Sequence, residues 1–415
     1  MVDKREKRLI GKLELREFKL SALLDVTRAI NSKASEKELL AHYSQALQIH
    51  LGIGRLVLYT VDLGRSFWRL LIANGVSGEV PDSQSIDFFN KLNSGGISLV
   101  GVEGLNNHSF DIVIPVYKDD VVIAFVLAGD KEEDAPGMSP VVKHLNFIQT
   151  LTNILVVALR NRELVDENLR QAGVRKELEL AGEMQAMLLP KIWPKDSKID
   201  VSGYYQPHQE IGGDYYDCFL VGDDQVVMCM ADVSGKGVGA AILMSNFQAN
   251  VRAIFNRDVQ SLIENVKELN TRVMASAQGE KFITFFVSVF DKKLNALEYV
   301  NCGHNPPLWI DEQGHSILLE RGAVGLGMFS ELPAVVSGNV EVQAGCSLIC
   351  YTDGLVEQEN EAGDEFGMKR LEDIVRRGEE KTLEEMHATM VQSLQKFRGS
   401  NPPLDDTALL SCRFR

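Results

Sequence analysis

Four aspartates in the second half of the chain occupy the same kind of position, at the junction between an apolar run and a turn. They are Asp214 after Ile-Gly-Gly, Asp232 after VVMCMA, Asp353 after SLICYT and Asp405 at the start of DDTALL. A carboxylate at such a junction lies at the rim of a sheet, and one alone is commonly a turn residue or a cap. Four in one domain favour a metal site. An all-carboxylate site suits Mg²⁺ or Mn²⁺, whereas Zn²⁺ prefers His or Cys.

Two of these acids lie at the ends of one predicted hairpin. Asp214 precedes the first strand-like run, Asp232 ends the second, and the polar turn Gly222-Asp223-Asp224 joins the two runs. This form places both carboxylates at the same end of adjacent strands. The turn SGKGVGAA follows, and it is not a P-loop, because Met230 stands where that motif requires its first glycine.

The whole chain has 415 residues, which predicts two or three domains. Its formal net charge of -15 argues against nucleic acid or an anionic membrane as a partner, since either requires a basic face. No apolar run approaches the roughly 18–20 residues that span a bilayer. The N-terminus has no apolar signal region, so we expect a cytoplasmic protein. The six cysteines show no C-x-x-C spacing and are expected to be buried, reduced thiols.

Residues 1–160 predict a small antiparallel sheet flanked by helices at both ends. The expected helices cover 1–50, with a cap at Ser35, Ser85–Leu92 and Pro140–Arg160, and the expected strands are Leu51–Asp62, Phe67–Ala73, Asp111–Tyr117 and Val121–Ala128. This order, and the run DIVIPVYKDDVVIAFVLAGDK, resemble a GAF domain, with a PAS-like sensor as the alternative. No residue identifies a ligand for it.

Residues 161–195 are expected to form a helical linker, which the prolines of LLPKIWP bring to an end. Val165, Leu169 and Ala172 fit the a and d positions of a coiled coil, but Arg162 and Lys176 interrupt this seam. The segment is therefore either an ordinary amphipathic connector or a stalk that joins two copies and carries the state of the sensor.

Residues 196–415 form the second expected domain, and strands dominate its pattern. Two antiparallel sheets with paired helices outside them accommodate the order of the elements, so the fold class is α+β. The main expected strands are Ile199–Gln206, Tyr215–Val221, Gln225–Asp232, Phe282–Phe290, Ala296–Val300, Ser347–Tyr351 and Ala408–Arg413, and the expected helices are 237–257, 259–277, 366–377 and 382–397.

Five segments of this domain resemble one known family, in the same order along the chain. GGDYYD, ADVSGKGVGAA, NCGHNPP, YTDGLVE and DDTALL look like motifs of the metal-dependent (PPM-type) protein serine/threonine phosphatases, and fit specifically the bacterial SpoIIE/RsbU-like branch. The resemblance covers about residues 180–415. It implies an αββα sandwich, preceded here by the GAF-like sensor, with a pair of Mn²⁺ or Mg²⁺ ions at one end of the sheets.

The resemblance also implies roles for the acids. Asp232 bridges the two ions, the backbone carbonyl of Val233 adds a ligand, Asp353 and Asp405 hold the other ion, and Asp214 ligates or orders metal-bound water. A divalent pair activates a shared water and requires no covalent nucleophile, so catalysis rests on Asp232 and Asp214.

Two departures from the family pattern bear on these roles. The family commonly ends in D-D-x-T, so Asp406 is the alternative to Asp405 as the last ligand. Eukaryotic members carry an Arg before the first acidic motif to receive the phosphate, and no Arg or Lys stands between Gln206 and Asp214.

Two basic side chains near the motifs have open roles. His304 either donates a proton to the leaving oxygen or touches the phosphate, or else it braces the turn into Pro306. Lys236 either contacts the phosphate or lies in a solvated turn.

Together these features predict a sensor-regulated phosphoprotein phosphatase with two Mn²⁺ or Mg²⁺ ions. The family branch implies a phosphoserine or phosphothreonine on a STAS-domain anti-sigma-factor antagonist as the substrate, and the linker predicts a homodimer. No nucleic-acid or membrane partner is expected. Two alternatives are a catalytically weak sensor that binds a phosphorylated partner and a metal-dependent hydrolase of a small phosphoester.

Overall fold

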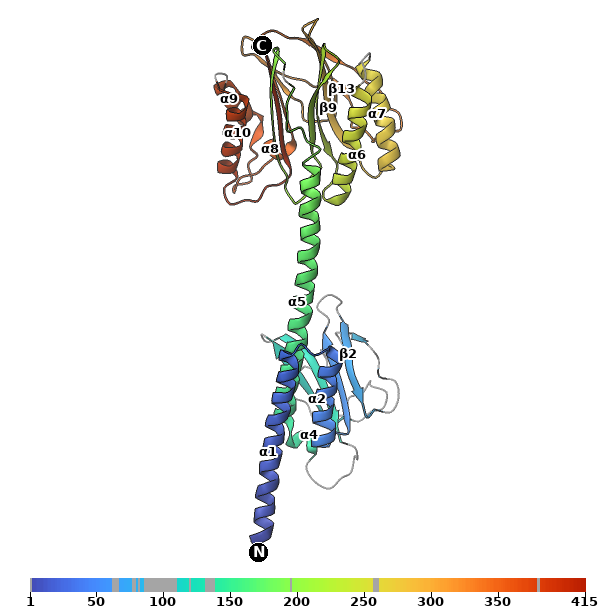
Figure 1. Ribbon diagram of the computed structural model, residues 1–415, viewed down its shortest axis with the longest axis vertical. Coiled ribbons are helices and arrows are strands. Elements are labelled where there is room, and N and C mark those ends of the chain that lie inside the picture. Colours follow the sequence, from blue (N-terminus) through green and yellow to red (C-terminus); the bar gives the residue numbers. More distant parts are fainter. Residues whose placement is uncertain are drawn as a thin grey trace. The chain divides into compact units, whose positions relative to one another are not determined.

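Two units make up the chain, Met1–Gln171 and Ala172–Arg415. The computed structural model describes residues 2–61, 67–76, 80, 83–85, 110–118, 121–130, 139–194, 196–256, 261–378 and 381–415. Helix α5 (Leu145–Gln185) begins in the first unit and ends in the second (Figure 1).

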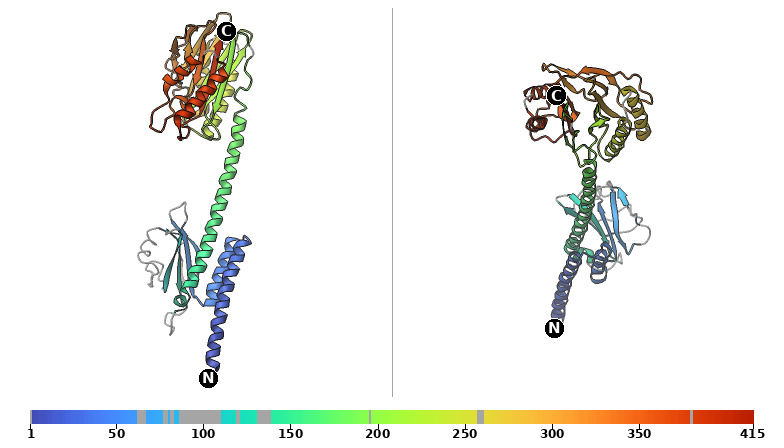
Figure 2. Two further views of the ribbon diagram at one scale, coloured as in Figure 1. Left: turned by 90° about the vertical axis from the view of Figure 1, so that its left-hand side faces the viewer. Right: turned by 45° about the horizontal axis from the view of Figure 1, so that its top comes forward.

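An antiparallel sheet with helices on one face forms the first unit. Its strand order is β3-β2-β1-β5-β4. The elements are α1 (Val2–Asn31), α2 (Glu36–Leu51), β1 (Arg55–Val61), β2 (Phe67–Asn74), β3 (Ser83–Ser85), β4 (Ile112–Lys118), β5 (Val121–Gly129) and α4 (Pro140–Lys143). Buried side chains of α1, α2 and α5 pack against one face of the sheet. Figure 2 shows these helices on that side of the sheet.

The predicted sheet with flanking helices is confirmed in this unit. The β4–β5 hairpin is present, and Ser35 caps α2 in a reciprocal pair with Glu38. The helix predicted over Ser85–Leu92 is wrong at its start, because Ser83–Ser85 pair with β2 as a strand. Residues 86–92 lie outside the described part of the chain. The GAF assignment stays a prediction.

Two mainly antiparallel sheets packed face to face form the second unit, and helices lie outside each sheet. This arrangement confirms the predicted αββα sandwich. One sheet has the order β13-β10-β9-β8-β7, with β14 on β10, and the other has the order β12-β11-β15-β16-β6. The strands of the first sheet are β7 (Tyr215–Val221), β8 (Gln225–Val233), β9 (Ile283–Asp291), β10 (Ala296–Cys302), β13 (Gly322–Ala323) and β14 (Gly338–Glu341). Those of the second are β6 (Ile199–Gln206), β11 (Leu308–Ile310), β12 (Ser316–Leu318), β15 (Ser347–Tyr351) and β16 (Thr407–Phe414). The helices are α6 (Val238–Phe255), α7 (Leu262–Ala277), α8 (Asp353–Val356), α9 (Gly367–Arg377) and α10 (Leu383–Arg398).

Alternation along the strands builds a core on both faces of the second sheet. In β15, Leu348 and Cys350 belong to the cluster between the sheets, whereas Ile349 and Tyr351 pack with α9 and α10. Figure 1 shows α6 and α7 on the outside of the first sheet and α9 and α10 on the outside of the second. All six cysteines are buried and free, as predicted.

The strand pairing brings the acids to one end of the sandwich. Tyr215 of β7 pairs with Ala231 of β8, so Asp214, just before β7, and Asp232, near the end of β8, lie at the same end of the sheet. Strands β15 and β16 are also antiparallel neighbours, so Asp353 follows one strand where Asp405 approaches the other. The register of two strand pairs therefore gathers residues from distant parts of the chain.

A buried ion pair ties the first of these strands to α6. Asp217 on β7 is fully buried and accepts hydrogen bonds from Arg252 Nε at 2.6 Å and Nη2 at 2.7 Å. The Tyr215 hydroxyl donates to the same carboxylate at 2.7 Å. The guanidinium lies 4.3 Å from the centre of the Phe219 ring, and the Arg252 side chain is 40% exposed. The last acid of the GGDYYD segment is thus a structural residue that orients β7 on α6.

We expect substitution of Arg252 to lower the free energy of unfolding more than substitution of Asp217. Arg252→Met leaves a carboxylate buried without its cation and should lower the free energy of unfolding by about 3–5 kcal/mol. Asp217→Asn leaves a half-exposed guanidinium that water can solvate, so its cost should be smaller, about 1–3 kcal/mol. Urea unfolding of both variants measures this order, and a larger loss in Asp217→Asn would contradict it.

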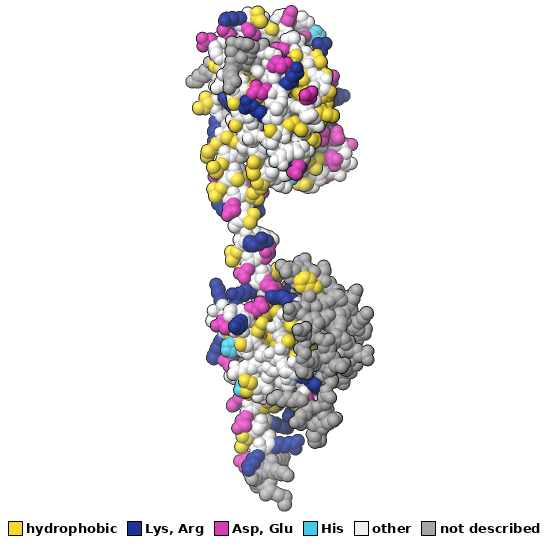
Figure 3. Space-filling view, turned by 90° about the vertical axis from the view of Figure 1, so that its right-hand side faces the viewer, with side chains coloured by type: hydrophobic (Ala, Val, Ile, Leu, Met, Phe, Trp, Pro, Cys, Tyr) yellow, Lys and Arg dark blue, Asp and Glu magenta, His cyan; other side chains and the backbone are white. Residues whose placement is uncertain are grey.

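The face of the second unit that Figure 3 displays carries side chains of several kinds. Figure 3 shows charged side chains of both signs among hydrophobic ones over the second unit. In the described part of the chain, no helix combines the length and the apolar character that crossing a membrane requires.

Candidate active site

A cavity of about 150 Å³ opens at the end of the sandwich where the acids gather. The residues around it include Asp232, Val233, Lys236, Asp353, Asp405 and Asp406. They come from the end of β8, the turn before α6, the start of α8 and the segment before β16. The structure therefore brings three of the four predicted acids, the predicted carbonyl residue and the predicted lysine to one place.

Asp214, the fourth acid, lies behind the cavity wall. Its side chain is 2% exposed, and its Oδ2 atom has no hydrogen-bond partner among the described residues. Burial and the nearby carboxylates of Asp232 and Asp406 raise the pKa of Asp214 well above its usual range. An unpaired buried carboxylate oxygen is costly unless a cation or proton meets it.

Repulsion between carboxylates extends to the acids of the cavity. Burial, followed by the charges of Asp353 and Asp405, raises the pKa of Asp232 to about 7. Burial and the charge of Asp405 also raise the pKa of Asp353. Each carboxylate thus disfavours ionisation of the others, and a bound divalent cation would relieve this repulsion.

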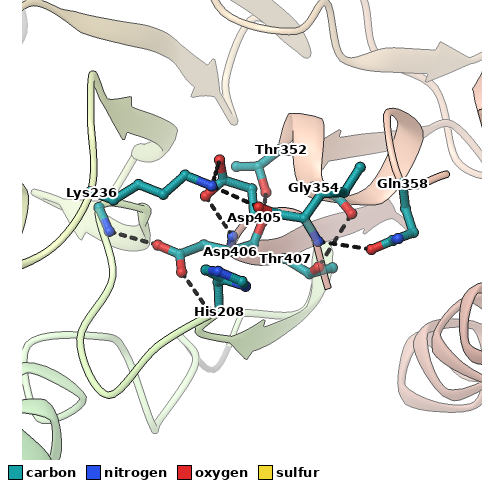
Figure 4. A network of polar contacts seen from close by, with 10 residues as sticks. His208, Lys236, Thr352, Gly354, Gln358, Asp405, Asp406 and Thr407 are labelled. Atoms are coloured by element: carbon teal, nitrogen blue, oxygen red, sulfur yellow. Dashed lines mark hydrogen bonds and ion pairs between the residues drawn. The ribbon is translucent and has the colours of Figure 1, made fainter. Parts of the chain in front are cut away.

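The structure separates the roles of the two adjacent acids before β16 (Figure 4). Asp406 is buried, and its two oxygens accept hydrogen bonds from the backbone amides of His208 at 2.7 Å and Gly213 at 2.6 Å. Asp405 is 38% exposed on its side chain and borders the cavity. Asp406 therefore braces the loop before β7, which leaves Asp405 as the carboxylate available to a ligand.

Lys236 joins this acidic cluster from the turn before α6. Its Nζ atom lies 2.8 Å from Asp405 Oδ2 and donates to the Leu404 carbonyl oxygen at 2.6 Å (Figure 4). The side chain is 47% exposed, so the ammonium group also meets solvent. It therefore lies where an anion entering the cavity would find a positive charge.

The chemical type of the donors around the cavity suits a hard divalent cation. Carboxylates of Asp232, Asp353 and Asp405 surround the cavity, and oxygen donors of this type suit Mg²⁺ or Mn²⁺. Among the described residues, no three His, Cys, Asp or Glu side chains come close enough together to enclose a metal ion as they stand. Lys236 draws Asp405 into an ion pair, so ion binding there requires the carboxylate to exchange this partner.

His304 is not among the residues that border the cavity, so the structure does not bring it to the predicted site. The side chain is 4% exposed, and its Nδ1 atom lies 2.9 Å from Thr284 Oγ1. Its backbone amide donates to Asn301 Oδ1 at 2.8 Å, and burial lowers the ring pKa to about 4. The residue holds the turn after β10, which is the structural role that the sequence left open.

His208 is a cavity residue that sequence reasoning missed. It borders the cavity, and its Nδ1 atom is buried without a hydrogen-bond partner in the described part of the chain. It stands between Gln206 and Asp214, in the segment where eukaryotic relatives carry their phosphate-binding Arg. A search for Arg or Lys alone passes over a histidine in this position.

The raised pKa of Asp232 predicts how stability depends on pH in protein stripped of divalent ions. Asp232 holds its proton in the folded state to about pH 7 but releases it near its usual pKa when unfolded. The folded state then binds more protons, so this residue lowers the free energy of unfolding as pH rises through this window.

We therefore expect Asp232→Asn to stabilise the ion-free protein more at pH 7.5 than at pH 5, by roughly 2–3 kcal/mol. Comparison of variant with wild type removes the opposite contribution of buried histidines. Asp223→Asn, on an exposed turn, is the control and should show no such difference. Chemical unfolding at both pH values is the measurement, and an equal effect of Asp232→Asn at both would contradict the assignment.

Comparison with known proteins places this unit. Residues 222–415 match the family model of stage II sporulation protein E (SpoIIE). Protein IcfG of Synechocystis sp. is 27% identical over 236 residues, which cover 51% of this chain and 37% of IcfG. Phosphoserine phosphatase RsbP of Bacillus subtilis is 24% identical over 245 residues, 57% of this chain and 58% of RsbP. Phosphoserine phosphatase RsbU of the same organism is 24% identical over 194 residues, 46% of this chain and 57% of RsbU.

The matched regions span between 37% and 58% of these relatives' own lengths. Among solved structures, the SiaA-PP2C domain of Pseudomonas aeruginosa superposes with a TM-score of 0.53 at 19% identity. It covers 59% of this chain and 99% of that domain, so the likeness concerns the fold. Residues 222–415 of this chain are therefore similar to the SpoIIE family, and the second unit has the PP2C-type phosphatase fold.

Proposed function

We propose that this chain is a metal-dependent protein phosphatase that hydrolyses phosphoserine or phosphothreonine on a regulatory partner protein. The observation that supports the proposal is the gathering of Asp232, Asp353 and Asp405 around one cavity, beside Lys236. The relatives RsbP and RsbU are named phosphoserine phosphatases, which favours phosphoserine. A partner with a STAS domain is the finer part of the proposal and rests on the resemblance of the five motifs to the SpoIIE/RsbU-like branch.

Asp214, Asp232, Asp353, Asp405 and the Val233 carbonyl are the proposed ligands of two Mn²⁺ or Mg²⁺ ions. When bound, such a pair lowers the pKa of a shared water and stabilises the attacking and leaving oxygens of an in-line displacement. Asp406 holds the loop before Asp214 through two backbone amides, which keeps the acids in one arrangement.

Lys236 and His208 are the proposed contacts of the substrate phosphate. The Lys236 ammonium lies at the cavity, already paired with Asp405, and a dianionic phosphate would compete for it. The His208 ring borders the same cavity from the loop before β7. Neither side chain forms a covalent bond in this proposal.

Release of phosphate from a phosphoserine protein in the presence of Mn²⁺ tests this function. Asp232→Asn should lower the rate at least ~100-fold, because it removes a central carboxylate. Asp223→Asn makes the same charge change on an exposed turn and should retain the wild-type rate.

The choice of substrate separates the proposal from its alternatives. We expect faster release from a phosphorylated STAS-domain protein than from p-nitrophenyl phosphate at equal concentration. No release by the wild-type chain with Mn²⁺ would favour a binding protein without catalysis. Preference for the small ester over every phosphoprotein would favour a small-molecule hydrolase.

A homodimer through α5 is the proposed route by which the first unit regulates the second. Val165 and Leu169 on this helix are 55% and 67% exposed, which is unusual for apolar side chains at a and d spacing. Pairing of two copies would cover them. The first unit would then alter activity by changing how the paired helices meet.

Substitution within this stripe tests the dimer. We expect the wild-type chain to show twice its mass of 46.1 kDa in solution. Leu169→Glu should give a monomer, because it buries a charge in the seam. Asn168→Glu adds the same charge at the neighbouring exposed position and should leave the dimer intact. Light scattering measures both, and a dimeric Leu169→Glu protein would contradict the seam.

A further inference from the structure

The end of helix α5 is bonded directly to the loop that precedes Asp214, here called the 208–214 loop (His208–Asp214). Gln185, the last residue of α5, is 7% exposed. Its Nε2 atom donates to the Gly212 carbonyl oxygen at 2.8 Å, and its Oε1 atom accepts from the Gly212 amide at 3.1 Å. Both polar groups of one buried side chain are thus used on one residue of the loop.

The same loop is held from its other side by Asp406. The carboxylate accepts from the amides of His208 and Gly213, on either side of the segment that Gln185 binds. A Cβ atom at Gly212 would overlap the Tyr205 hydroxyl and an oxygen of Asp406. The loop is therefore clamped between Gln185 and Asp406, and it has no space in which to shift toward β16.

Two further contacts fit the helix to the loop. A Cβ atom at Gly182 would overlap the Glu210 carbonyl oxygen, so the helix and the loop backbone touch at this position. Arg175 Nε lies 3.2 Å from Glu210 Oε1. Positions 175, 182 and 185 follow an i, i+7, i+10 spacing, which places them on one side of α5. One side of the helix end thus contacts the loop at both Glu210 and Gly212.

The loop carries atoms of the cavity wall. A Cβ atom at Gly213 would lie 3.1 Å from the Val233 carbonyl oxygen and 3.6 Å from Asp232 Oδ1. Asp214 follows at once and is buried next to the same acids. A movement of Gly212 would therefore displace groups that border Asp232.

We propose that Gln185 is a positioning residue that couples the end of α5 to the acidic cavity through the 208–214 loop. Helix α5 is continuous and starts in the first unit. A rotation or fraying of its last turn would move Gln185 and so disturb the loop that Gln185 binds. This inference rests on the proposed phosphatase function for its catalytic consequence, but the coupling itself is a property of the fold. Without Gln185, the loop would be held from the side of β16 by Asp406 but would lack its bond to the helix.

Gln185→Met in the full chain tests the coupling. Methionine has nearly the same shape and helix propensity but makes neither hydrogen bond. The control is Met184→Gln, the reverse change at the neighbouring position, which is 69% exposed. A second variant, Gly182→Ala, favours the helix but pushes its end away from the Glu210 carbonyl, so it tests the contact without altering Gln185.

Two readouts are compared among these proteins. Hydrogen–deuterium exchange of ion-free protein should become at least about fivefold faster in peptides that cover 207–214, because the loop amides lose their restraint. With Mn²⁺, kcat on a phosphoserine protein should fall on the order of tenfold with KM changed less than about twofold, since the defect lies in positioning. Met184→Gln should match the wild type in both.

Unchanged exchange of the loop in both Gln185→Met and Gly182→Ala would overturn the coupling. Faster exchange with unchanged kcat would overturn the positioning role and leave Gln185 as a structural bond. If the wild-type chain releases no phosphate, the proposed function fails, while the exchange experiment still decides whether the helix holds the loop.

Discussion

Repulsion among carboxylates at one end of the β-sandwich is the constraint around which the second unit is built. Asp214, Asp232 and Asp353 all have pKa values raised by burial and by neighbouring carboxylates. Isolated chain segments would not hold these groups together, because each ionised neighbour disfavours the next. The free energy that keeps them in place comes from the two sheets, whose buried side chains form a continuous core between them.

The polar contacts near the cavity show how the fold tolerates this cluster. Asp406 accepts hydrogen bonds from two backbone amides, and Lys236 offsets the charge of Asp405. On the far side of β7, Asp217 is neutralised by Arg252. Asp214, Asp232 and Asp353 form no ion pair with the described residues, so a divalent ion would stabilise these three carboxylates most. A site of this kind is prepared for its ligand at a cost in the stability of the ion-free protein.

Much of the fold could be predicted because its signals are local. Strand pairs joined by short polar turns, such as β7–β8, and the Ser35 cap of α2 depend on neighbouring residues only. Asp232, Asp353 and Asp405 were also within reach, since an acid at the end of an apolar strand is visible in the sequence. These three acids share one cavity because β15 pairs with β16 and the two sheets pack together. The sequence alone does not predict the distances between these strands.

The parts that sequence reasoning left open or missed depend on long-range contacts. Asp405 and Asp406 are adjacent and identical, and their partners distinguish them: Lys236 for Asp405, and the amides of His208 and Gly213 for Asp406. His304 lies in a conspicuous motif, yet its ring is turned into the core toward Thr284. Gln185 carries no motif, and its role depends on a loop elsewhere in the chain. The polar residues that shape the candidate site are thus those whose partners lie far away in sequence.

Calorimetric titration of Mn²⁺ into the ion-free full chain tests the central claim most directly, because it reports binding by the acids without requiring a substrate. We predict two ions per chain for the wild type and a loss of at least one in Asp353→Asn and in Asp405→Asn. Absence of binding to the wild type, or equal binding by all three proteins, would contradict the account.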